Sequence, residues 1–237
     1  MRKIDPAGVL DDFEAQLEDQ SQFYQQTWEA LPNAANRKVA SENYALAIGV
    51  MFEGFVNDLI LAYANRNCSR VMQHLKSSLE EHLKSNSKAK ATFEHFGEVR
   101  ERKHLNVSEL KEILDPEGRN TSFSDYSAIR KRASQWLSED HLENFTQLGA
   151  RDQAVVNVVI AVRNNLAHRS KGSLDRLNEV LSAGPLHDTG LQRQVNRVQQ
   201  AGNYLKSYTG QNFTRADVLG EYLGNIARQL AGQEIAE

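Results

Sequence analysis

Apolar residues recur every three or four positions along most of this chain, and the alternation typical of a half-buried strand is almost absent. A first amphipathic segment runs from about residue 8 to 31 and stops at Pro32, which cannot continue a helix. The next segment, about 36–66, is apolar nearly all round, as a helix buried among other helices would be. The pattern predicts an all-α protein.

The valine-rich run from Ala154 to Val162 could be mistaken for a strand. Because it continues without a break to His168, we predict a helix that closes at Gly172, a residue type common just after helix ends. Elsewhere we expect weaker, solvated helices over 69–114, broken near 85–87, and a turn at 115–118. After residue 173 we expect three helices, at 173–183, 188–208 and 214–230.

The composition limits the cellular compartment and the kinds of site that we expect. Cys68 is the single cysteine, so neither an intramolecular disulfide nor a Cys-rich zinc site can form. No stretch approaches the roughly 20 apolar residues of a membrane span, and the first 17 residues lack the apolar run of a secretory segment. We therefore expect a cytoplasmic protein without membrane contact. The net charge is −3, so RNA would have to meet a local basic patch.

Arg163, Asn164 and His168 stand at the polar end of the valine-rich segment. An arginine that holds a phosphate and a histidine that moves a proton are together sufficient to cleave RNA without a metal. The alternative is an ordinary helix end, where both side chains meet solvent and the negative end of the helix dipole. Residues five apart lie about 140° apart around a regular helix, so convergence requires a distorted helix end or a second subunit.

Glu53 lies within the most apolar segment of the chain. Burying a carboxylate is costly unless it is paired, so we expect a partner such as Arg163; the alternative is a glutamate on the one wet strip of that helix. Gly49 and Gly54 each cost about 1 kcal/mol of helix stability relative to alanine, and we attribute both to close packing of a neighbouring helix.

Local positive charge makes further residues candidates for binding RNA phosphates, although charge runs are usually solvated faces. These candidates are Arg130, Lys131, Arg132, Arg169 and Lys171. The scattered histidines form no compact ligand pattern, and the phosphate-binding and serine-hydrolase glycine motifs are missing from the sequence. We expect neither a metal nor a cofactor.

Three segments in order resemble the HEPN superfamily of α-helical ribonucleases (higher eukaryote and prokaryote nucleotide-binding domains). They are AIGVMFEGFVNDL at 47–59, SELKEIL at 108–114 and RNNLAH at 163–168. The resemblance is closest to prokaryotic members with an EGF helix and a terminal RN-x-x-AH. It implies an HEPN-like helical core over 36–172, with an N-terminal helix (1–35) and a C-terminal helical extension (173–237).

The same resemblance implies a homodimer in which two R-x4-H motifs line one cleft. It also implies metal-independent RNA cleavage, often by a toxin or phage-defence effector with an antitoxin or defence-system partner. Arg163 and His168 take the catalytic positions, Asn164 a supporting polar position and Glu53 a site-organising one. Arg169 departs from the family, because the commoner ending has glycine after the histidine.

Two other functions remain open: a non-catalytic binding module of the same fold, serving as an antitoxin partner or adaptor, and a purely structural helical oligomer. The intact Arg163, Asn164 and His168 favour an enzyme, whereas the negative net charge favours contacts with proteins.

Overall fold

The computed structural model describes residues 3–99, 102, 104–115, 122–210 and 212–233, and this part of the chain is mostly helical with no strand. The predicted all-α class is confirmed. The helices are α1 (Pro6–Ala30), α2 (Ala34–Arg66), α3 (Ser69–Ser85), α4 (Ser87–Phe96), α5 (Val107–Leu114), α6 (Tyr126–Trp136), α7 (Glu139–Thr146), α8 (Ala150–His168), α9 (Lys171–Val180), the 3₁₀ helix η1 (Gly184–Thr189), α10 (Ala201–Leu205) and α11 (Arg215–Leu230).

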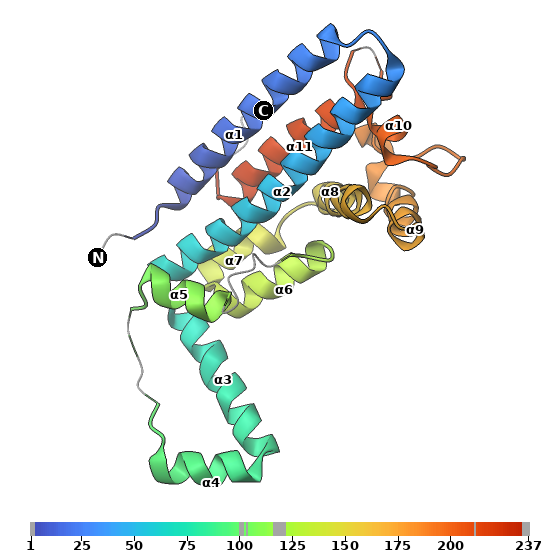
Figure 1. Ribbon diagram of the computed structural model, residues 1–237. Helices are drawn as coiled ribbons and strands as arrows, with labels where there is room; N and C mark the ends of the chain where they lie inside the picture. Colours follow the sequence, from blue (N-terminus) through green and yellow to red (C-terminus); the bar gives the residue numbers. More distant parts are fainter. Residues whose placement is uncertain (1–2, 100–101, 103, 116–121, 211, 234–237) are drawn as a thin grey trace.

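The long helix α2 is the centre of the fold (Figure 1). It packs against α1, α8, α10 and α11, and its N-terminus is capped by Asn33, whose side chain accepts a hydrogen bond from the Asn36 amide at 2.8 Å. Phe52 of α2, Val158 of α8 and Leu223 of α11 are fully buried members of one apolar core. Helix α2 is therefore the platform against which the other elements are positioned.

The apolar character of α2 also bears on the membrane question. It contains an 18-residue window with a mean hydropathy of 1.7, long and apolar enough to cross a membrane by composition alone. The expectation that no stretch approaches a membrane span is therefore wrong for α2. Within the fold 61% of that window is buried, which is the environment of a core helix.

Helices α3 and α4 form an arm that projects away from the body (Figure 1). Val71 is the one buried residue that α3 contributes, and α4 contributes none. The predicted solvated helices and the break near residues 85–87 are confirmed. Of the predicted turn at 115–118, only Asp115 belongs to the described residues.

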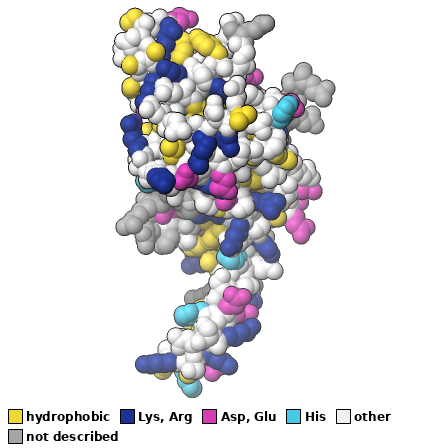
Figure 2. Space-filling view, turned by 90° about the vertical axis from the view of Figure 1, so that its right-hand side faces the viewer, with side chains coloured by type: hydrophobic (Ala, Val, Ile, Leu, Met, Phe, Trp, Pro, Cys, Tyr) yellow, Lys and Arg dark blue, Asp and Glu magenta, His cyan; other side chains and the backbone are white. Residues whose placement is uncertain are grey.

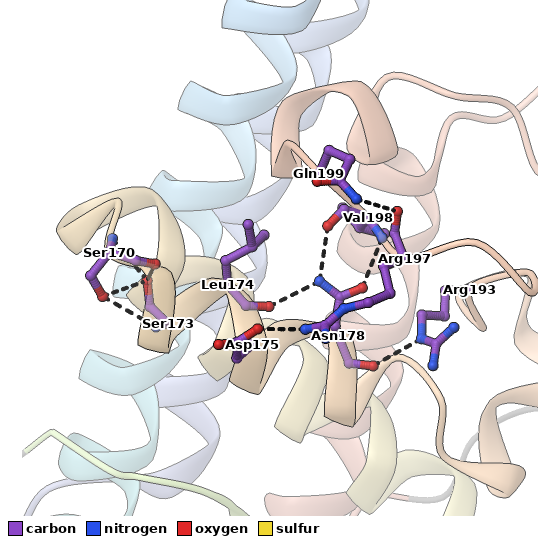
Figure 3. Close-up of polar contacts among 9 residues, drawn as sticks. All are labelled: Ser170, Ser173, Leu174, Asp175, Asn178, Arg193, Arg197, Val198 and Gln199. Atoms are coloured by element: carbon purple, nitrogen blue, oxygen red, sulfur yellow. Dashed lines mark hydrogen bonds and ion pairs between the residues drawn. The ribbon is translucent and has the colours of Figure 1, made fainter.

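The C-terminal region differs from prediction, because the expected helix at 188–208 is replaced by η1, an irregular segment and the short α10. Figure 3 shows how α9 holds this segment. The buried Asn178 side chain donates to the Val198 carbonyl at 2.9 Å and accepts from the Val198 amide at 2.7 Å. Arg193 Nε donates to the Asn178 carbonyl at 3.0 Å, and Arg197 pairs with Asp175. These long-range bonds satisfy backbone groups that a helix would otherwise pair locally.

Candidate active site

A largely buried ion pair joins α2 to α8 at the place that the sequence indicates. The Arg163 guanidinium pairs with the Glu53 carboxylate, and the two side chains are only 18% and 12% exposed. The predicted pairing of Glu53 is confirmed, and the alternative of a solvated strip is wrong. Burial lowers the pKa of Arg163, although an arginine remains charged at any working pH.

Two neighbours fix the orientation of this pair. Glu53 Oε1 accepts a hydrogen bond from the Phe123 amide at 3.2 Å, so the segment before α6 also contacts the carboxylate. On the other side, Arg163 Nη1 donates to Asn164 Oδ1 at 2.6 Å. Arg163 is thereby held between a carboxylate and an amide, which restricts its rotamer.

The two helices approach each other closely at one of the two predicted glycines. A Cβ atom added at Gly49 would lie 3.0 Å from Arg163 Cβ and 3.3 Å from Arg163 Cγ, so α8 sits directly on this backbone. At Gly54 such an atom would meet nothing within 4 Å. The packing explanation therefore holds for Gly49 and is wrong for Gly54.

His168 is the last residue of α8 and is exposed. The predicted closure at Gly172 is wrong, because the chain turns at Arg169, which adopts the left-handed conformation with φ 49° and ψ 29°. Gly172 instead lies inside α9. Within the described part of the chain, His168 has no hydrogen bond or ion pair. Its ring is consequently available to exchange a proton with a ligand.

Arg163, Asn164 and His168 line one cleft of about 580 Å³, whose other walls come from the residues before α6 and from α9. Helix α8 stays regular as far as His168, so the helix distortion considered from the sequence does not occur. No hydrogen bond joins Arg163 to His168. The cleft therefore presents a fixed cation and a free imidazole from a single chain, with open space between the surrounding elements.

Two residues of this cleft escaped sequence reasoning. Arg176 of α9 lines it and pairs with Glu179 at 2.9 Å. Ser173 also lines it and accepts a hydrogen bond from Asn165 Nδ2 at 3.1 Å, which ties the end of α8 to the start of α9. Asn165 is 8% exposed. A polar residue on the buried side of an apolar helix needs a hydrogen-bond partner, and this requirement was the sequence signal for the contact with Ser173.

Acidic charge lies close to the cleft as well. Asp125 caps α6 by accepting from the Ala128 amide at 3.0 Å. The hydrogen bond from Ser127 lowers the pKa of Asp125, with smaller contributions from the Ala128 amide and the Arg176 charge, so this carboxylate is ionised at neutral pH. Together with Glu53 it offsets much of the positive charge around the cleft.

The five predicted phosphate-binding residues are not brought together. Arg130 and Lys131 are exposed on α6, whereas Arg132 is half-buried and donates from Nη2 to the Leu114 carbonyl at 3.0 Å, tying α6 to the end of α5. Burial lowers the pKa of Arg132. Arg169 and Lys171 line a second hollow across the α8–α9 turn from the cleft.

Within the described residues, no group of three or more His, Cys, Asp or Glu side chains could hold a metal ion. No protein-family model, curated protein or solved structure matches the chain. What the site does chemically has to be argued from its own residues.

Proposed function

We propose that this protein is a metal-independent endoribonuclease of the HEPN type. The observation that carries the proposal is the cleft of a single chain in which an anchored Arg163 and an unbonded His168 both face the same space. The HEPN assignment itself rests on the three sequence segments that resemble that superfamily.

In the proposed reaction, the 2′-OH of a ribose attacks the adjacent phosphate, and the bond from phosphorus to the 5′ oxygen of the next nucleotide breaks. His168 serves as the general base that takes the 2′-OH proton, or as the general acid that protonates the departing 5′ oxygen. The products are a 2′,3′-cyclic phosphate and a 5′-OH. DNA lacks the attacking hydroxyl and is inert.

Arg163 stabilises the negative charge that develops on the phosphoryl oxygens. A guanidinium has five N–H donors, and the contacts with Glu53 and Asn164 leave others for a phosphate. Glu53 and Asn164 are therefore positioning residues, which hold the donor fork in place before RNA arrives.

One observation favours a non-catalytic binding module as the second candidate. Glu53 neutralises Arg163, and the whole chain carries a net charge of −3, so the cleft does not present the strong positive field expected of a nucleic-acid site. In that case the same fold would contact a protein, as an antitoxin partner or adaptor.

Purified protein incubated with total RNA distinguishes the two candidates. We expect cleavage that survives excess EDTA, leaves 2′,3′-cyclic phosphate ends and spares DNA of the same sequence. Loss of cleavage with EDTA would contradict the proposed chemistry. RNA that stays intact under all conditions would favour the binding module.

In the cell we propose that the enzyme acts in the cytoplasm as a toxin or phage-defence effector, restrained by an antitoxin or another defence-system protein. The toxin or phage-defence role follows from the HEPN resemblance. The exposed position of the cleft is compatible with a partner that covers it.

We also expect a two-fold homodimer in which Arg163 and His168 of both chains face a shared cleft, because closed two-fold symmetry is the commonest oligomeric arrangement. Light scattering at micromolar concentration should give twice the chain mass of 26.7 kDa. A monomer at that concentration would remove the prediction. Mixing Arg163→Ala protein with His168→Ala protein tests whether the two chains share one site. Activity should return only if one chain can supply the arginine and the other the histidine of the same cleft.

A further inference from the structure

A second hollow, of about 380 Å³, lies across the α8–α9 turn from the candidate active site. Lys38 and Glu42 of α2 form one wall, Arg169 and Lys171 another, and Gln200 lies beside α10. On the side of the body that faces the viewer in Figure 2, Lys and Arg side chains are numerous, and acidic side chains lie between some of them. The lining of the hollow carries an excess of positive charge, in contrast to the net charge of −3 of the whole chain.

The charges inside the hollow are unequal. Glu42 is the one carboxylate among its lining residues, and it lies 3.3 Å from Arg169 Nη2 and 3.7 Å from Lys38 Nζ. Lys171 has no ion pair within the described residues. Three cations thus face a single internal anion, which leaves two positive charges in excess.

Glu42 is held in a confined position. Its side chain is 13% exposed, although Arg169, which pairs with it, is 75% exposed. A Cβ atom added at Gly202 of α10 would lie 2.2 Å from Glu42 Oε1, so α10 closes directly over the carboxylate. The carboxylate is therefore enclosed, whereas the guanidinium that pairs with it is open to an external anion.

The surrounding backbone is fixed. Ser170 caps α9 through a reciprocal pair of hydrogen bonds with Ser173, and the far end of α9 is held by the Asn178 contacts of Figure 3. The N-terminus of α9 adds the positive end of its dipole beside Lys171. The cations are therefore presented from a rigid turn.

We propose that this hollow is a phosphate subsite for the RNA strand, in which an RNA phosphate competes with Glu42, the internal counter-ion, for Arg169. The inference rests on the proposed function. The hollow would supply the net positive charge that the cleft lacks. In the cleft, Arg163 is paired with Glu53 and Arg176 with Glu179, so the cleft contributes little net charge to RNA binding.

The chain path supports a strand that crosses the turn. His168 lines the cleft and Arg169 lines the hollow, and the Cα atoms of consecutive residues are about 3.8 Å apart. An RNA strand with its scissile phosphate beside His168 would place a neighbouring phosphate beside Arg169 and Lys171. The hollow would hold the strand in register while the cleft acts on it.

The test measures binding separately from cleavage. The probe is a short fluorescein-labelled single-stranded RNA that carries 2′-O-methyl groups throughout, which removes the attacking hydroxyl. Its affinity is followed by fluorescence anisotropy over a series of KCl concentrations. For single strands each neutralised phosphate contributes about 0.7 to the slope of log affinity against log salt, or about fivefold in affinity near 0.1 M salt.

We expect Lys171→Ala and Arg169→Gly each to weaken binding about fivefold and to lower the salt slope by about 0.7. Glycine is chosen at Arg169 because it readily adopts the left-handed conformation of that residue. Glu42→Gln keeps the shape but removes the competing charge, and it should tighten binding about fivefold. Lys88→Ala, an exposed lysine on α4, is the matched control and should bind like the wild type.

Unchanged affinity in both Lys171→Ala and Arg169→Gly would overturn the subsite, as would weaker binding by folded Glu42→Gln. Cleavage of unmodified RNA by the wild-type protein decides the proposed function independently. If that RNA is cleaved while the two cation variants bind normally, only the subsite fails. If it is not cleaved but the cation variants bind weakly, the subsite stands and the ribonuclease proposal fails.

Discussion

Replacing His168 with alanine is expected to lower single-turnover RNA cleavage by about 10²- to 10⁴-fold, the contribution of a positioned general acid or base. The side chain is exposed at the end of α8 and has no hydrogen bond within the described residues, so its removal leaves the rest of the cleft in place. The melting temperature should change little, since exposed substitutions rarely alter stability by more than about 0.5 kcal/mol.

His187→Ala is the matched control for this experiment. His187 is also exposed, and it bonds Asp188 rather than lining the cleft. The His187→Ala variant should cleave RNA at the wild-type rate. Undiminished cleavage by His168→Ala, with contaminating nuclease excluded, would show that the site is wrongly placed.

Arg163→Ala should lower cleavage by a similar factor, but unlike His168→Ala it should also destabilise the fold. The structure places Arg163 in a largely buried ion pair with Glu53, so its loss would leave a carboxylate unpaired. The cleavage rates of Arg163→Ala and the wild-type protein should therefore be compared at a temperature at which circular dichroism shows that the variant is folded.

The sequence predicts those features that local pattern and burial cost determine. The valine-rich run is recognisable as part of α8 because it continues into a polar segment without a break. The Glu53–Arg163 pair is predictable because a carboxylate in an apolar helix requires a partner. In both cases one strong physical constraint leaves few alternatives.

Features that depend on distant contacts were not predictable. Helix α8 is followed by Arg169 in a left-handed conformation that glycine usually supplies, so the glycine signal pointed to the wrong residue, whereas the Ser170–Ser173 capping box marks the start of α9. The segment 188–208 is mostly non-helical because Asn178 bonds Val198, a contact across 20 residues. That Arg163 and His168 share a cleft depends on the placement of α9 and of the residues before α6.

Glu53→Ala is expected to destabilise the fold by about 3 kcal/mol, because removing one partner of a buried ion pair leaves the other charge uncompensated. Arg163, only 18% exposed, would lose its counter-ion, and the Phe123 amide would lose its acceptor. Urea denaturation should show a lower midpoint with an unchanged slope, which identifies a change in stability rather than in the denatured state.

The matched control is Glu179→Ala, which breaks the exposed pair with Arg176 and should cost less than about 1 kcal/mol. Replacing Glu53 and Arg163 together with leucine should be less destabilising than Glu53→Ala alone, because no buried charge is then left unpaired. A midpoint for Glu53→Ala equal to that of the wild type would mean that the pair is solvated in solution. Asn164 would then be the only residue that anchors Arg163. That result would contradict the proposal that Arg163 is held in place before it binds a phosphate.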